Sequence, residues 1–294
     1  MKKLYKWLVI IFIVILSLSL RIYAANNLQI DADESVYVNS GLEYAKYIRE
    51  NEWKWLAWSN TNFEHPALNK IIYGFALLLE EPIDKLFDKD VQSYTPIQAT
   101  EGRPWIMVGR YGSVIFGTLA IFVLSFINPL AGFLLGIDTL NIQYTSVMYI
   151  EALPLLTSLC SVVAYLKFIT SFDKQKRPQY FYWLILSAIF LGMSAASKYI
   201  YSIVSFPILF HFILWMIKKK YRTKVITYIF AWGMLSIVVF TVCNPYLWLH
   251  PIERLTESLL FHVSYSSSVS VTQFDFPFWQ PLKWFTAPIA SLYP

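Results

Sequence analysis

Long apolar runs recur along the chain and constrain its fold more than any other feature. A membrane-spanning helix needs about 20 mostly apolar residues. Seven stretches meet this requirement: 4–24, 104–127, 129–148, 152–170, 180–197, 200–217 and 225–243. A soluble domain of 294 residues could not bury a composition that is 56% hydrophobic, whereas a bilayer solvates it. The sequence therefore predicts an all-α polytopic membrane protein, a bundle of about seven transmembrane helices.

The basic residues gather in short links between apolar runs and predict the topology. Three clusters stand out: Lys2, Lys3 and Lys6; Lys174, Lys176 and Arg177; and Lys218, Lys219, Lys220, Arg222 and Lys224. Cytoplasmic links are enriched in Lys and Arg. The seven runs place an even number of spans between neighbouring clusters, so all three can be cytoplasmic. The net charge of +5 thus indicates topology and no nucleic-acid partner.

The chain from 25 to 103 is predicted to be one large external loop within a single membrane domain, 1–294. Its apolar stretch 67–80 is too short to span and predicts an interfacial or re-entrant helix. Trp53, Trp55 and Trp58 are expected to anchor the loop among lipid headgroups. The first run has the charge pattern of a signal peptide, but its length favours a retained anchor. The stretch 244–294 is expected to be a second external segment.

Two acidic motifs in this loop carry groups able to do chemistry. Asp33 and Glu34 follow the first span directly, and Glu64 and His65 come about thirty residues later. Carboxylates at the edge of a low-dielectric region can act as general bases or bind a divalent cation. A solvated acidic surface is the alternative interpretation.

The cations Arg110 and Lys198 lie at the predicted external ends of spans. A cation in the membrane is costly unless it is paired, extends to the interface or binds an anion. Glu151 is the nearest candidate counter-ion in the sequence pattern.

A series of motifs resembles those of one enzyme superfamily. In chain order they are Asp33-Glu34 with Tyr37, Phe63-Glu64-His65-Pro66-Ala67-Leu68-Asn69-Lys70, Gly109-Arg110-Tyr111-Gly112-Ser113, Tyr149-Ile150-Glu151-Ala152, Gly192-Met193-Ser194-Ala195-Ala196-Ser197-Lys198-Tyr199 and Asn244-Pro245-Tyr246-Leu247-Trp248. They resemble the dolichyl-phosphate-mannose protein mannosyltransferases and the related lipid A aminoarabinose transferases, members of the GT-C superfamily. Ala67, Asn69 and Glu151 depart from the usual pattern. The family's further C-terminal spans are not present, so this is a short member or a fragment.

The resemblance implies a GT-C-type bundle and an activity. The enzyme would transfer a sugar, most simply mannose, from a polyprenyl or dolichyl phosphate carrier to a hydroxyl of a protein Ser/Thr or of a lipid. It implies Asp33 as base with Glu34 beside it. Arg110, Lys198, Glu151, His65 and Tyr37 would bind the phosphate and sugar. Apart from the resemblance, the residue types also allow a divalent metal cation with Glu64 and His262 as its ligands, and a solvated surface histidine is the alternative interpretation of His262.

Other interpretations remain open at the sequence level. Another lipid-linked sugar could serve as donor, with a lipid or glycan as acceptor. A transporter or flippase would also place charges in the membrane, although inverted repeats and broken spans, which are typical of transporters, are not evident in the sequence. A non-catalytic assembly subunit is the third alternative. In each case the expected location is the plasma membrane or the ER membrane, with the N-terminus cytoplasmic and the site on the other face.

Overall fold

The structure is a computed structural model and describes residues 2–79, 103–173, 179–217, 222–273, 277 and 279. Parts of the predicted loop 25–103, the basic links at 174–178 and 218–221, and most of 274–294 lie outside this range. The described chain is helical and divides into two compact units, Met1–Pro251 and Ile252–Pro294. The second unit holds most of α13 (Pro251–Ser266) and all of α14 (Val269–Thr272).

Within the described residues, six helical segments are long and apolar enough to cross a membrane. They are Leu4–Asn27, Arg103–Ile127, Ala152–Phe172, Tyr180–Ser197, Tyr199–Ile217 and Thr223–Val242. They belong in turn to α1 (Lys2–Asn27), α6 (Arg103–Ile127), α9 (Ala152–Asp173), α10 (Gln179–Ser197), the pair η1 (Tyr199–Val204) and α11 (Ser205–Ile217), and α12 (Arg222–Val242). The prediction of an all-α polytopic membrane protein is confirmed at this level, because side chains such as Phe206, Phe210 and Phe230 are each more than 60% exposed and require an apolar solvent.

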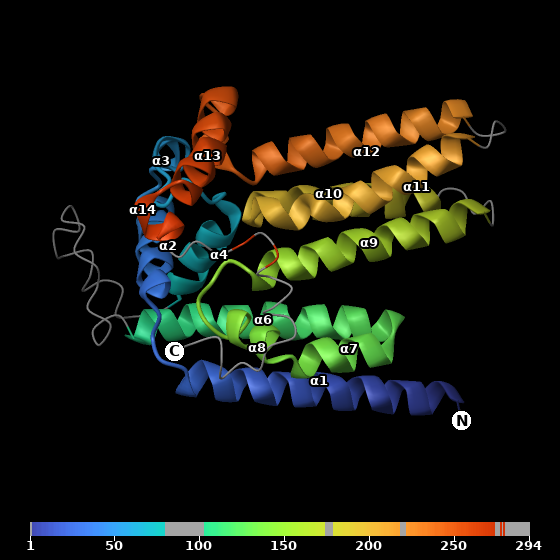
Figure 1. Ribbon diagram of the computed structural model, residues 1–294, viewed down its shortest axis with the longest axis horizontal. Helices are drawn as coiled ribbons and strands as arrows, with labels where there is room; N and C mark the ends of the chain where they lie inside the picture. The colour runs from blue at the N-terminus through green and yellow to red at the C-terminus, as the bar shows by residue number, and fades with distance from the viewer. Residues whose placement is uncertain are drawn as a thin grey trace. The chain divides into compact units, whose positions relative to one another are not determined.

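The segment 129–148, predicted as a seventh span, contains no single helix long enough to cross a membrane. The segment forms two short helices, α7 (Pro129–Ile137) and α8 (Thr139–Tyr144). At 1.5 Å per residue α7 is about 14 Å long, half of the apolar thickness of a bilayer. Asp138 ends α7 in an extended conformation, and its carboxylate caps α8 by accepting a hydrogen bond from Asn141 N at 2.7 Å. The two helices run back beside α6 and α1 as a broken segment (Figure 1).

A buried arginine donates hydrogen bonds to several polar groups of this broken segment. Arg21 of α1 is fully buried, and its guanidinium donates to Thr145 Oγ1 at 2.8 Å, to Asn141 Oδ1 and to Gly136 O at 3.4 Å. A break in a helix inside an apolar bundle leaves backbone groups that need such partners. Arg21 therefore allows the chain between α6 and α9 to leave the helical conformation.

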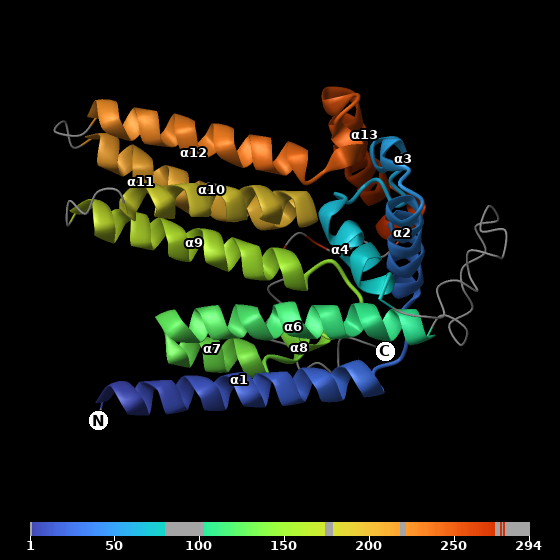
Figure 2. The ribbon, with the colours of Figure 1, turned by 180° about the vertical axis from the view of Figure 1, so that it is seen from behind.

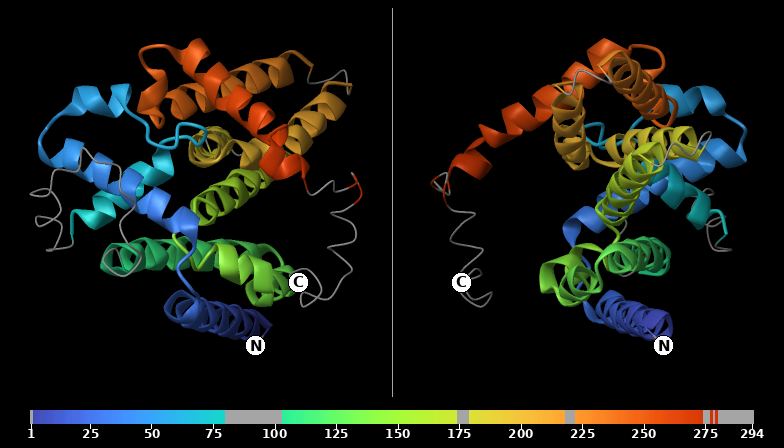
Figure 3. Two further views of the ribbon diagram at one scale, coloured as in Figure 1. Left: turned by 60° about the vertical axis from the view of Figure 1, so that its left-hand side comes forward. Right: turned by 90° about the vertical axis from the view of Figure 1, so that its right-hand side faces the viewer.

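The long helices of the first unit pack in the sequence α1, α6, α9, α10 and α12, with α11 against α12. Figure 3 shows α1 and α12 at opposite sides of this bundle. Between α9, α10, α11 and α12 lies an aromatic core whose buried members are Tyr165, Phe168, Tyr180, Phe212, Trp215, Tyr228 and Trp232. Gly192 allows α10 to approach α12 closely, since a Cβ there would lie 2.6 Å from Ser236 O.

Three shorter helices gather at one end of the bundle, which we call the site end. They are α2 (Ala32–Arg49), α3 (Trp53–Trp58) and α4 (Leu68–Leu77), and they lie where α1 ends and α6 begins (Figure 2). α4 is too short to cross a bilayer, as the stretch 67–80 predicted. Tyr37 and Leu42 of α2, Tyr73 of α4 and Trp105 of α6 share one apolar core that fixes α2 and α4 on the bundle.

Candidate functional site

The site begins with the first turn of α2. Asp31 caps the helix, with its Oδ1 3.0 Å from Asp33 N, and the Glu34 carboxylate accepts a hydrogen bond from Asp31 N at 3.0 Å. This reciprocal pair is a capping box, which fixes the start of a helix. Because residues 33 and 34 lie about 100° apart around the helix axis, the box turns Glu34 inward and leaves Asp33 on the exposed side.

Glu34 and Arg110 form a bidentate ion pair. Arg110 Nε lies 2.8 Å from Glu34 Oε1, and Nη2 lies 2.6 Å from Oε2. The side chains are 0% and 2% exposed. Met148 N also donates to Glu34 Oε1 at 2.7 Å, so this carboxylate ties the broken segment to α2 and α6.

Arg110 uses its remaining hydrogens on the chain that leaves α1. Nη1 donates to Ala25 O at 2.6 Å and to Leu28 O at 3.0 Å, and Nη2 donates to Gln29 O at 2.9 Å. With the two bonds to Glu34, all five N–H donors of the guanidinium have partners within the protein. Arg110, the expected phosphate ligand, is thus engaged in a structural ion pair. Its partner is Glu34, which was expected to act beside Asp33.

Lys198 pairs with Glu151, the counter-ion that the sequence pattern suggested. Lys198 stands in an extended conformation between α10 and η1, and its ammonium contacts Glu151 Oε1. The side chains are 25% and 17% exposed, so this pair can be reached from outside the protein. Glu151 Oε2 is buried and accepts no hydrogen bond from the residues that the structure describes. Lys198 is therefore the accessible cation of the two predicted phosphate ligands.

Asp33 lies within electrostatic range of Lys198. Partial burial raises the pKa of Asp33, the carboxylate of Asp31 raises it further, and the ammonium of Lys198 opposes both effects. An aspartate with a raised pKa beside a cation is a plausible acid or base for catalysis. The structure thus brings Asp33 and Lys198, 165 residues apart in the sequence, to the same part of the site end.

Tyr37 occupies the centre of the candidate site. Its ring centroid lies 6.3 Å from that of His65 and 6.0 Å from that of Tyr149. Burial raises the pKa of Tyr37, and the carboxylates of Glu151, Asp33 and Glu64 raise it further. The phenol therefore stays protonated and can donate one hydrogen bond among three acidic groups. Tyr149, which was named only as the first residue of a motif and not as a site residue, joins the site through its ring contact and its hydrogen bond to Asp31.

The two expected metal ligands lie in different compact units. Glu64 lies in the first unit, where Asn62 Nδ2 donates to its carboxylate, and His262 lies in α13 of the second unit. Among the described residues there is no cluster of three or more His, Cys, Asp and Glu side chains that could hold a metal ion. The divalent cation with Glu64 and His262 as ligands stays a prediction.

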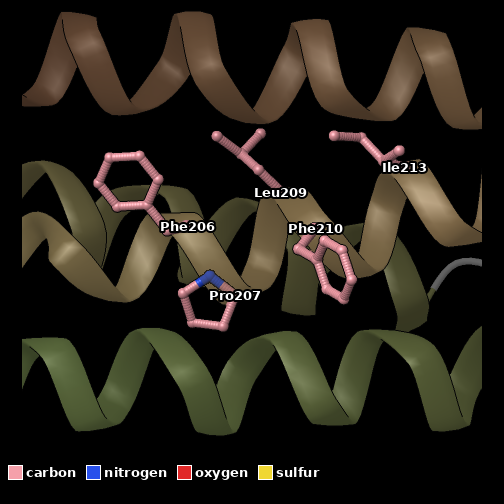
Figure 4. Close-up of a pocket in the computed structure, with 5 residues that line it drawn as sticks. All are labelled: Phe206, Pro207, Leu209, Phe210 and Ile213. Carbon is pink, nitrogen blue, oxygen red and sulfur yellow. The ribbon is translucent and has the colours of Figure 1, made fainter.

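Two cavities mark regions where ligands could lie. One, of about 340 Å³, opens beside Asp31 and is lined by Leu28, Gln29, Ile30, Asp31, Gln143, Val147 and Tyr149. The other, of about 520 Å³, is apolar and follows one face of α11, with Leu209 and Ile213 pointing toward α12 (Figure 4). α11 begins only a few residues after Lys198, so a charged headgroup and an apolar chain could be held by consecutive parts of one span.

No protein-family model and no curated protein matches this chain. The function is therefore argued from the arrangement of Asp33, Tyr37, Glu151 and Lys198.

Proposed function

We propose that the protein is a glycosyltransferase that moves a sugar from a polyprenyl phosphate carrier to an acceptor hydroxyl at the site end. The observation that carries this proposal is the accessible Lys198–Glu151 pair within electrostatic range of Asp33. A lipid-linked donor provides an anionic phosphate and a long apolar chain. Lys198 offers a partner for the phosphate, and the apolar face of α11 offers one for the chain.

The proposed reaction is a direct displacement at the anomeric carbon. The acceptor oxygen forms the new bond to that carbon, and Asp33 takes the hydroxyl proton. The bond from the carbon to the phosphate oxygen breaks, and the carrier phosphate leaves with the electron pair and an additional negative charge. Lys198 would hold this charge, since a positioned cation stabilises charge that develops in the transition state. By resemblance, the anomeric configuration would invert.

The remaining residues have supporting roles in this proposal. Glu151 keeps the Lys198 ammonium in place, and its second oxygen can accept a hydrogen bond from a sugar hydroxyl. Tyr37 and His65 border the sugar, while Glu34 and Arg110 fix α2 so that Asp33 faces the site. Mannose is the proposed sugar and a protein Ser/Thr hydroxyl the proposed acceptor. Both choices rest on the motifs Asp33-Glu34 and His65-Pro66-Ala67-Leu68-Asn69-Lys70 and not on the shape of the site.

The test is sugar transfer in membranes that contain equal amounts of wild type or Asp33→Asn. The donor is polyprenyl phosphate carrying radiolabelled mannose, and label in protein and lipid fractions is counted separately. The proposal expects wild type to transfer label and Asp33→Asn to lose at least a hundredfold in rate, the range of general base catalysis. Unchanged transfer by Asp33→Asn would refute the role of Asp33.

A transporter or flippase is the second candidate, and one structural observation favours it. The broken segment 129–148 and the interruption between α10 and η1 at Lys198 are the kind of discontinuous helices that transporters use at substrate sites. Proteoliposomes distinguish the two functions. Movement of an intact labelled polyprenyl phosphate sugar across the bilayer, with no sugar released from its carrier, would support transport.

A further inference from the structure

The turn before α4 is closed around a buried lysine. Lys70 is 0% exposed. Its Nζ donates to Thr61 O at 3.0 Å, to Asn62 O at 2.8 Å and to His65 O at 3.0 Å, and Asn60 Oδ1 is a fourth acceptor. Three of these acceptors are backbone carbonyls of one short turn, which all point at the same atom.

A ring of converging carbonyls is unfavourable without a cation, because the dipoles repel and each buried oxygen needs a donor. The turn also contains Asn62 at φ 61°, in the left-handed region that costs most residues energy. Lys70 offsets both costs by supplying three N–H donors and a positive charge. Burial lowers the pKa of Lys70, while the carboxylates of Glu64 and Glu43 oppose this change and favour the charged ammonium group.

Neighbouring groups hold the turn but do not replace the lysine. Asn60 Nδ2 donates to His65 O at 3.2 Å, and Ala67 N donates to Asn244 Oδ1 at 3.2 Å. The Glu43 carboxylate accepts hydrogen bonds from Ser59 Oγ and Thr61 Oγ1. These contacts anchor the two ends of the turn, and only Lys70 is seen to reach Thr61, Asn62 and His65 together among the described residues.

We infer that Lys70 is a positioning residue that acts as a built-in cation for the turn 60–65 and so holds Glu64 and His65 against Tyr37. The sugar-binding role of Tyr37 and His65 rests on the proposed function. The hydrogen bonding of Lys70 to the turn does not depend on that function, because four acceptors surround its ammonium group. In this arrangement Lys70 never touches a ligand, and its effect passes through the backbone of the turn.

The first test measures the turn without any turnover. Lys70→Met keeps an unbranched side chain of nearly the same length and removes its charge and donors, and Lys54→Met, at an exposed position on α3, is the matched control. In nanodiscs, Lys70→Met should speed amide hydrogen exchange in residues 61–66 at least tenfold and change the rate at which diethyl pyrocarbonate modifies His65. Exchange in α9, α10 and α12 should stay at wild-type values, as should both readouts in Lys54→Met. If residues 61–66 of Lys70→Met exchange their amide hydrogens at the wild-type rate, the inference is overturned.

The second test separates positioning from general stability. If the turn presents Glu64 and His65, Lys70→Met should lower kcat for sugar transfer at least tenfold and change KM for the donor less than threefold, since Lys198 is untouched. Loosened exchange with an unchanged kcat would overturn the positioning role. A wild type without transferase activity would overturn the proposed function. The exchange result would still decide whether Lys70 holds the turn 60–65. If Lys70→Met does not fold, Lys70→Gln is the second variant: its neutral amide can donate to fewer of the carbonyls, and faster exchange confined to 61–66 is again the required result.

Discussion

The carboxylate of Glu34 and the guanidinium of Arg110, 76 residues apart in the chain, meet in a buried bidentate pair. Glu34 also accepts hydrogen bonds from Asp31 N and Met148 N. The pair therefore joins the end of α1, the start of α2, α6 and the broken segment. Its neighbour in the sequence, Asp33, faces the accessible part of the site, so adjacent acidic residues have different roles.

Replacement of Arg110 should unfold the site end, whereas replacement of Asp33 should not. Arg110→Met leaves the Glu34 carboxylate buried without its charge partner, which typically costs about 3–5 kcal/mol. The measurement is the melting temperature in detergent by tryptophan fluorescence. We expect a large decrease for Arg110→Met and for Glu34→Gln, and no decrease for Asp33→Asn. A stable and inactive Arg110→Met protein would instead indicate that Arg110 contacts the substrate.

The pH dependence of transfer should report the environment of Asp33. A general base must be deprotonated, so kcat/KM should fall on the acidic side as pH drops through the raised pKa of Asp33. Asp31→Asn removes a like charge and should move this acidic limb to lower pH, while Asn still caps α2. Lys198→Met removes an opposite charge and should move the limb to higher pH. If the acidic limbs of Asp31→Asn and Lys198→Met do not move in opposite directions, a group other than Asp33 titrates in this limb.

The long helices could be predicted from the sequence because an apolar run of 20 residues has few alternatives. The segment 129–148 was the exception: its hydropathy indicates a span, but Asn128, Pro129 and Asp138 supply two helix starts. A hydropathy window adds apolar side chains and does not detect that Asp138 caps a new helix. It also cannot show that Arg21, more than a hundred residues earlier, satisfies the break.

The pairing of charges at the site could be predicted only in part. Glu151 was expected to serve both cations, and it pairs with Lys198, while Arg110 pairs with Glu34. The partner of Arg110 depends on how α2 packs against α6, which no local pattern encodes. Lys70 appeared in the sequence only as the last residue of a motif. One signal was available in the sequence: Lys70 stands on an apolar helix, directly after a turn rich in Asn and Thr. This position indicates that the charge of Lys70 is buried.

The contact of α10 with α12 should depend on Gly192 and not on Gly233. A Cβ at Gly192 would lie 2.6 Å from Ser236 O and 2.7 Å from Val239 Cβ, whereas at Gly233 no atom lies within 4 Å. We expect Gly192→Ala to lower the melting temperature by several degrees, because the helices must separate. Gly233→Ala should leave it unchanged or raise it, since Ala favours a helix over Gly by roughly 1 kcal/mol. Equal effects of the two substitutions would contradict this packing of α10 against α12.

Lys198 should decide the affinity for the carrier phosphate, and Arg110 should not contribute to it. A hydrogen bond to a charged group typically contributes about 1.5–3 kcal/mol, so Lys198→Gln should weaken binding by roughly 10- to 150-fold. The measurement is competition by polyprenyl phosphate against a fluorescent polyprenyl phosphate in detergent, which requires no transfer. Glu151→Gln provides the complementary variant: it removes the charge that holds the ammonium, and it should change affinity less than Lys198→Gln does. Unaltered binding in Lys198→Gln would place the phosphate elsewhere, and the Lys198–Glu151 pair would then be a structural contact between α10 and the start of α9.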